Sequence, residues 1–211
     1  MGGHIFSVPN PTISPFLQWA RDTRISWLEF MTSVKGRIVL GLDPGIVSTG
    51  FGVISVEGNR FRPVEYGVIK TSNDWPLEQC LAEIFSKMKA LLKKHEPSAA
   101  GVESLYFNVN VRTALAVGQA RGVALLACAQ ADCKVFEYTP QQVKRAVAGY
   151  GKAEKTQIME MVRVLLGMSE IPRPDHAADA LGVAICHANT CGVREGVEKV
   201  LKRDEERRTR T

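Results

Sequence analysis

Three apolar segments joined by short connections constrain the fold more than any other feature of this chain. They span residues 37–43, 50–57 and 64–70, and each is rich in Val, Ile, Leu or aromatic side chains. The connections between them contain Gly, Asn and Ser and leave no room for a crossover helix. Parallel neighbours need a crossover of about a dozen residues or more. The three segments therefore predict an antiparallel meander.

Helical and strand-like segments alternate after the meander. Residues 74–95 place Leu, Ile, Phe and Met at spacings of three and four, as an amphipathic helix does, and Pro97 follows. Further predicted strands are 99–103 and 134–138, and further predicted helices are 110–131, 140–147, 154–167 and 175–190. This order predicts an α/β protein with a five-stranded mixed sheet, three antiparallel strands then two parallel, and helices on both faces. The RNase H-like fold has this order of elements.

The length of 211 residues suits one domain with extensions. We expect an extension at 1–35, a domain at 36–190 and a charged tail at 191–211 that frays into solvent. Residues 16–31 have the pattern of an amphipathic helix, which suits docking or a membrane surface. We favour instead a dispensable extension, with Met31 as a possible start.

Composition excludes some classes of protein. The formal charge of +5 and the pI of about 9.0 are compatible with a polyanionic partner but do not establish one. No apolar stretch is long enough to span a membrane. The five cysteines are odd in number and include no Cys-x-x-Cys, which favours reduced thiols and a cytoplasmic protein.

Acidic residues stand where the predicted elements end or begin. Asp43 ends the first strand in Asp-Pro-Gly, Glu103 ends the fourth, and His176 and Asp179 lie one turn apart at the start of the last helix. If the two strands are neighbours, their acids meet at one end of the sheet, opposite the helix. Converging carboxylates need cations, and oxygen ligands with one imidazole suit Mg²⁺ or Mn²⁺. Two such ions can promote phosphodiester cleavage.

Each of these residues also has an ordinary explanation. Asp-Pro-Gly is common turn chemistry, which explains Asp43 as well as a ligand role does. Glu103 could cap a loop, Asp175 suits a helix start, and a lone His176 is more often a surface residue. Only their joint occurrence in this order of elements favours the metal site.

Six motifs in order now identify a family. They lie at 41–45, 102–107, 116–122, 138–144, 149–155 and 176–181. Together they resemble the RuvC family of bacterial Holliday junction resolvases. The resemblance implies that Asp43, Glu103, His176 and Asp179 are the catalytic positions and bind two Mg²⁺ ions, with Mn²⁺ possible. The third position is Asp or His within the family, which leaves His176 or Asp175 as the general base.

The resemblance also implies DNA contacts and partners. Tyr106 occupies the position of an aromatic residue near the junction crossover, and Lys144 and Lys155 match basic residues that face the DNA. Arg121 is a candidate from its charge alone. The implied protein is a homodimer that cuts four-way DNA junctions by paired nicks in recombination and repair, alongside the branch-migration complex RuvA-RuvB. Gly118 and Gly122 mark the helix at 110–131 as a candidate dimer interface, unless that face lies on its own sheet.

Three other functions compete with this one. The loop after Asp43 superficially resembles the phosphate loop of ATP-binding proteins of the actin and sugar-kinase type, but those need two such domains. A related nuclease acting on RNA would share the same acids. A junction-binding protein without catalysis is the third, and the full acidic set argues against it.

Overall fold

The computed structural model describes residues 36–104 and 111–208, with side chains left undescribed at 111–113 and 192–208. The strands are β1 (Arg37–Asp43), β2 (Ser48–Glu57), β3 (Arg60–Lys70), β4 (Ala99–Glu103) and β5 (Lys134–Tyr138). The helices are α3 (Leu77–His95), α4 (Val111–Gln130), α5 (Pro140–Ala148), α6 (Lys155–Leu165) and α7 (Asp175–Arg208).

The five strands form one sheet in the order β3-β2-β1-β4-β5. β2 pairs antiparallel with β1 and β3, whereas β4 pairs parallel with β1 and β5. This confirms the predicted mixed sheet. In the parallel pair Leu42 lies beside Val102, so the residues that follow them, Asp43 and Glu103, leave neighbouring strands at the same end.

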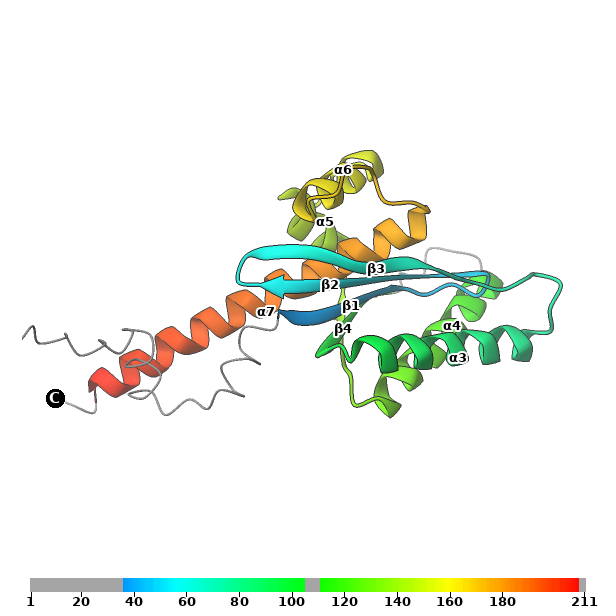
Figure 1. The fold of residues 1–211 in the computed structure, drawn as a ribbon, viewed down its shortest axis with the longest axis horizontal. Coiled ribbons are helices and arrows are strands. Elements are labelled where there is room, and N and C mark those ends of the chain that lie inside the picture. The colour runs from blue at the N-terminus through cyan, green and yellow to red at the C-terminus, as the bar shows by residue number, and fades with distance from the viewer. Residues whose placement is uncertain (1–35, 105–110, 209–211) are drawn as a thin grey trace, which may run out of the picture. The chain divides into compact units, whose positions relative to one another are not determined.

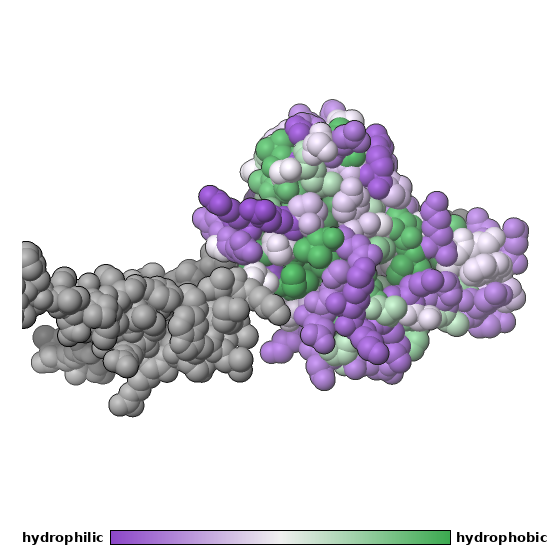
Figure 2. Space-filling view, viewed as in Figure 1, coloured by the Kyte–Doolittle hydropathy of each residue, from purple (hydrophilic) through white to green (hydrophobic). Residues whose placement is uncertain are grey.

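Helices cover both faces of the sheet, as predicted. Figure 1 shows α5 and α6 on one side and α3 and α4 on the other. Successive side chains of β1 point to opposite faces of the sheet. Val39 packs in the hydrophobic core with α5, α6 and α7, whereas Leu40 and Leu42 pack in the core with α3 and α4. Hydrophilic side chains cover much of the described surface in Figure 2, with smaller apolar patches among them.

Glycines under α7 let that helix lie unusually close to the sheet. A Cβ placed on Gly41 would stand 1.9 Å from the backbone oxygen of Ala180, and one on Gly50 would stand 2.1 Å from that of His176. Gly52 and Gly101 also face α7. On the helix side, alanines lie between the polar residues. Small residues on both surfaces thus bring the first turns of α7 against the ends of the strands.

Two element boundaries differ from the predictions more than the others do. β3 begins at Arg60 rather than residue 64, because an edge strand tolerates Pro63 and charged side chains. α7 continues to Arg208 rather than ending near residue 190, so the expected fraying from Arg194 onward is wrong. Lys, Arg and Glu dominate this stretch, and their helix propensity is high.

The predicted extension at 1–35 lies outside the described residues. Within the part of the chain that is described, no helix combines the length and apolar character needed to cross a membrane. All five cysteines are free thiols.

Candidate metal centre

Asp43 is held at the mouth of the sheet by β1 and by the turn that follows. The hydroxyl of Thr49, fully buried, donates to the backbone oxygen of Gly45 at 2.7 Å. The backbone N–H of Gly45 points back to the same hydroxyl at 3.4 Å. Turn and ligand were alternative explanations of Asp-Pro-Gly, and the geometry accommodates both, because a well-bonded turn aims the carboxylate.

The start of α7 brings two more polar side chains to Asp43. His176 Nδ1 lies 2.7 Å from Asp43 Oδ2. A hydrogen bond from this ring to an ionised carboxylate requires the proton on Nδ1. Ligand atoms of Asp43, His176 and Asp179 all lie within 4.8 Å of one another. Asp43 and His176 are 133 positions apart in the sequence, yet the fold brings them into one cluster.

Glu103 stands beside this cluster at the end of β4. Burial raises its pKa to about 7, and the charges of Asp43 and Asp179 add to the rise while Lys144 opposes it. Its carboxylate is not among the atoms that fall within the 4.8 Å group. The charges of both aspartates nevertheless influence its pKa, so Glu103 lies close to the cluster.

Lys155, the first residue of α6, supplies a positive charge to the cluster. Its Nζ lies 3.2 Å from Asp179 Oδ2 and 3.2 Å from Asp175 Oδ2. Burial raises the pKa of Asp179 above its ordinary value, and the ammonium of Lys155 counteracts part of this rise. Burial by itself would lower the pKa of Lys155, but Asp179 and Asp175 outweigh it and the net shift is upward. The site therefore gathers excess negative charge and already attracts a cation.

Asp175 has different surroundings from the other acids. It is exposed to solvent on one side and pairs with both Lys155 and Arg173, whose Nη1 lies 2.7 Å from Asp175 Oδ1. The hydrogen bond from Lys155, with its charge and that of Arg173, lowers the pKa of Asp175. A lowered pKa makes a carboxylate a poorer proton acceptor.

The predicted DNA-contacting residues have separate positions. Lys144 on α5 lies close enough to Glu103 to influence its pKa, and Lys155 lies at the cluster itself. Arg121 on α4 is only 9% exposed and is bonded within the protein, to the backbone oxygen of Glu103 and to the side chain of Glu137. Tyr106 lies outside the described residues.

Sequence reasoning missed the glycine surface under α7 and the inward direction of Arg121. The glycines carried a usable signal, since Gly41 lies inside an apolar strand and Gly50 and Gly52 alternate along the next. Glycine inside a strand often marks a close approach of another backbone. Nothing in the local sequence signals the direction of Arg121.

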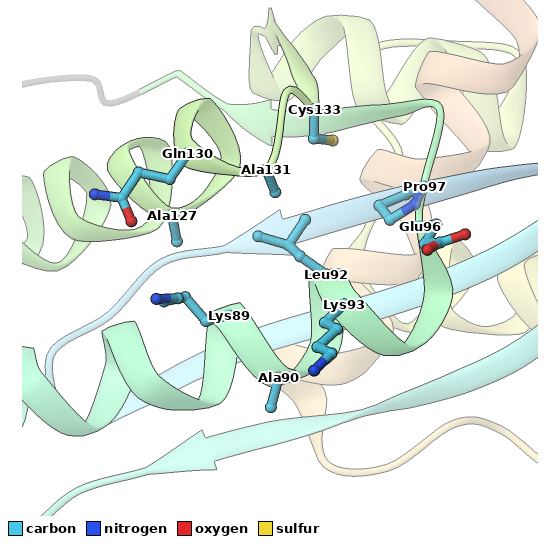
Figure 3. Close-up of a pocket in the computed structure, with 10 residues that line it drawn as sticks. All are labelled: Lys89, Ala90, Leu92, Lys93, Glu96, Pro97, Ala127, Gln130, Ala131 and Cys133. Atoms are coloured by element: carbon cyan, nitrogen blue, oxygen red, sulfur yellow. The ribbon is translucent and has the colours of Figure 1, made fainter.

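A separate groove of about 590 Å³ lies between the C-terminal parts of α3 and α4. Figure 3 shows Lys89 and Lys93 on its α3 side and Gln130 and Cys133 on the opposite side. It lies against the helices that cover the other face of the sheet from α7 and includes none of the clustered acids. The groove is therefore not part of the acidic site.

A family model described as "Crossover junction endodeoxyribonuclease RuvC" matches residues 39–187. A protein of that name from Desulforamulus reducens is 54% identical over 151 residues, which cover 72% of this chain and 93% of the relative. Another from Brevibacillus brevis is 52% identical over 164 residues, covering 76% and 99%.

Solved structures show the same likeness. The chain is similar to T. thermophilus RuvC in complex with Holliday junction substrate, with a TM-score of 0.72 and 39% identity over 74% of this chain and 96% of that one. The yeast mitochondrial Holliday junction resolvase Ydc2 is 13% identical with a TM-score of 0.55, over 73% and 78% of the two chains. At that identity the likeness shows the fold alone.

Proposed function

Because this chain belongs to the RuvC family of crossover junction endodeoxyribonucleases, we propose that it cuts four-way DNA junctions by hydrolysing phosphodiester bonds. The single observation that carries the proposal is the convergence of Asp43, His176 and Asp179, with Glu103 beside them, on a fold similar to a relative solved with its junction. Such cutting serves recombination and DNA repair.

The proposed cofactor is Mg²⁺, with Mn²⁺ as a possible substitute and two ions at each site. The donor set fits these ions, since two carboxylates and one imidazole meet, with the carboxylate of Glu103 beside them, and burial raises the pKa values of Glu103 and Asp179. Asp43, Glu103, His176 and Asp179 would hold them. When bound, the ions would activate water and stabilise the charge that develops on the leaving oxygen.

The protein's own groups would position the substrate and move protons. Lys155 is bonded to Asp179 and Asp175, and an ion that took over Asp179 would leave its ammonium available to a DNA phosphate. Lys144 is proposed to contact phosphate in the same way. The Nδ1–H of His176 donates to Asp43, which in the neutral ring leaves Nε2 as the acceptor. His176 is therefore the general base only if the three carboxylates alone hold the ions, because Nε2 cannot bind a metal ion and accept a proton at the same time.

A homodimer is part of the proposal, because a four-way junction has near two-fold symmetry and two symmetric sites would nick it in pairs. The support is on α4, where Leu115 and Leu126 are 63% and 52% exposed and a Cβ on Gly118 or Gly122 would meet nothing within 4 Å. If these glycines packed on their own sheet, a Cβ built on them would meet atoms of the sheet, and none lies within 4 Å. A cytoplasmic location, stacking of Tyr106 at the crossover and cooperation with RuvA-RuvB complete the proposal.

The test is cleavage of a synthetic mobile four-way junction by wild type and Asp43→Asn in Mg²⁺. Loss of a metal ligand should lower the cleavage rate by about 1000-fold or more, since Lewis-acid stabilisation is worth several kcal/mol. Junction binding, measured in Ca²⁺ so that no strand is cut, should be retained.

Linear duplex and structured RNA serve as controls for the substrate. Cleavage of the junction by Asp43→Asn at the wild-type rate would show that the metal assignment is wrong. Faster turnover of structured RNA than of the junction would favour the RNA nuclease, and tight ATP binding without DNA cleavage would favour the ATP-binding alternative.

A further inference from the structure

Arg121 is a buried cation that reaches the end of β4 from α4. Its side chain crosses from the helix to the strand end, where Nη1 donates to the backbone oxygen of Glu103 at 2.9 Å. Its other terminal nitrogen, Nη2, pairs with Glu137 Oε1 on β5. One guanidinium therefore joins the helix, the residue that carries a candidate metal ligand, and the neighbouring strand.

The end of β4 has a second attachment on the β5 side. Beyond Glu103, the backbone N–H of Ser104 donates to the backbone oxygen of Tyr138 at 2.8 Å. Residues 105–110, which follow directly, lie outside the described part of the chain. The end of β4 at Glu103 is thus held by β5 through the backbone of Ser104 and by α4 through Arg121.

We propose that Arg121 is a positioning residue that holds Glu103 in the geometry needed to bind metal. The inference rests on the proposed function and extends it to a residue outside the acidic cluster. Groups that orient metal ligands without touching the metal commonly change affinity or activity by about 10–100-fold when they are removed. A charged donor on a buried backbone oxygen is also a strong hydrogen bond.

This role differs from the DNA contact that the charge of Arg121 suggested. A residue that binds phosphate needs an exposed head group, whereas Arg121 is 9% exposed and both ends of its guanidinium are bonded. A different face of α4 carries the exposed Leu115 and Leu126. If that face binds a second copy, Arg121 connects the dimer interface to the catalytic carboxylate.

The test compares wild type with Arg121→Gln, Arg121→Lys and Arg163→Gln. Arg163 on α6 is a matched control, because it too donates to a backbone oxygen, that of Met168 at 3.1 Å, and pairs with a carboxylate, Glu160. Folding is checked by thermal unfolding of each variant. The readouts are kcat and KM for a four-way junction, the Mg²⁺ concentration that gives half the maximal rate, and junction affinity in Ca²⁺ as a function of salt.

Arg121→Gln should lower kcat by about 10–100-fold and raise the half-saturating Mg²⁺ concentration by about 10-fold or more. Junction affinity and its salt dependence should stay within about two-fold of wild type. Arg121→Lys keeps one donor and should restore part of kcat, and Arg163→Gln should behave as wild type. An equal loss of kcat in Arg163→Gln would show that a general structural effect is responsible.

A phosphate contact would give a different result. If Arg121→Gln weakens junction binding and reduces the salt slope by about one phosphate contact, the positioning role is wrong. An unchanged kcat and Mg²⁺ requirement would also overturn it.

Mn²⁺ binding to the free protein separates this inference from the proposed function. If wild type does not cut junctions but binds Mn²⁺, and Arg121→Gln weakens that binding about 10-fold, the positioning role stands while the proposed substrate fails. A wild type that neither cuts nor binds Mn²⁺ overturns both.

Discussion

Glu103 and Glu160 are chemically identical side chains whose surroundings shift their pKa values in opposite directions. Burial and two neighbouring aspartates raise the pKa of Glu103 to about 7. The hydrogen bond and charge of Arg163 lower the pKa of Glu160 on the solvent-exposed face of α6. The same residue type is therefore a metal-ligand candidate with a raised pKa at one site and half of an ordinary surface ion pair at the other.

The raised pKa of Glu103 predicts how stability changes with pH. Between its ordinary value of 4.5 and about 7, the folded protein binds more protons at Glu103 than the unfolded chain does. The metal-free protein should therefore lose stability as pH rises through this window. Thermal unfolding in EDTA at about pH 5 and about pH 8 measures the loss, which should be smaller in Glu103→Gln.

Glu160→Gln is the matched control for this experiment. The pKa of Glu160 is lowered from 4.5, so its contribution to stability is lost only at pH values below about that value. Glu160→Gln should therefore show the same difference in stability between about pH 5 and about pH 8 as wild type. A wild type that is more stable at the higher pH, with no dependence on Glu103, would contradict the prediction.

At the scale of elements, the position of α7 decides whether the site exists. Its first turns supply His176 and Asp179, and the glycines of β1 and β2 let the helix backbone approach the strands closely enough for His176 to reach Asp43. Only the absence of a Cβ permits this approach. The glycines are therefore as necessary to the metal centre as the ligands, although they carry no chemistry themselves.

Gly41→Ala should destabilise the protein and disrupt the site together. The added Cβ would meet the backbone of Ala180 at 1.9 Å and of Ala184 at 2.6 Å, and neither can move without moving α7. Overpacking of this kind costs about 1–3 kcal/mol or more. Denaturant unfolding and Mg²⁺-dependent cleavage are the measurements.

Gly182→Ala on α7 controls for the loss of a glycine. Its Cβ would meet the nearest atom, Val143 Cγ1, at 3.6 Å, which is ordinary contact, and the change should be neutral or stabilise the helix by up to about 1 kcal/mol. If Gly41→Ala were as stable and active as Gly182→Ala, the close approach of α7 would not be required.

At the scale of the whole molecule, α4 has two faces with different partners. Ala120, Ala124 and Ala127 are buried in the core against the sheet, as part of the cluster shared with α3. Leu115, Gly118, Gly122 and Leu126 lie on the opposite face at helical spacing and make no close contact with their own chain at the glycines. An apolar stripe with small residues at its centre suits a second helix.

Leu126→Glu should therefore weaken dimerisation. Burying a charge against an apolar partner surface is costly, so the dimer dissociation constant should rise by about 100-fold or more. Sedimentation equilibrium measures the constant. Val164→Glu introduces the same charge at a residue of α6 that is 53% exposed and should leave association unchanged. Equal association of both variants would exclude this face of α4 from the interface.

Much of the fold followed from local patterns in the sequence. The five strands, the antiparallel meander of the first three and the existence of all five described helices were predicted, because periodicity and turn residues are properties of neighbouring positions. The pairing of β1 with β4 was only a condition of the prediction, and the structure supplies it. The errors fell at the ends of elements. β3 begins earlier because an edge strand tolerates Pro63 and charged side chains, and α7 runs further because Lys, Arg and Glu have high helix propensity.

By itself the sequence determined the order of the elements and named Asp43, Glu103, His176 and Asp179 as residues that belong together. Only the tertiary structure decided that His176 touches Asp43, that Lys155 lies against Asp179, and that Arg121 turns inward to Glu103. The physical reason is that these contacts depend on strand register and on how closely a helix packs on a sheet. Both are set by residues far apart in the chain, which no local pattern records.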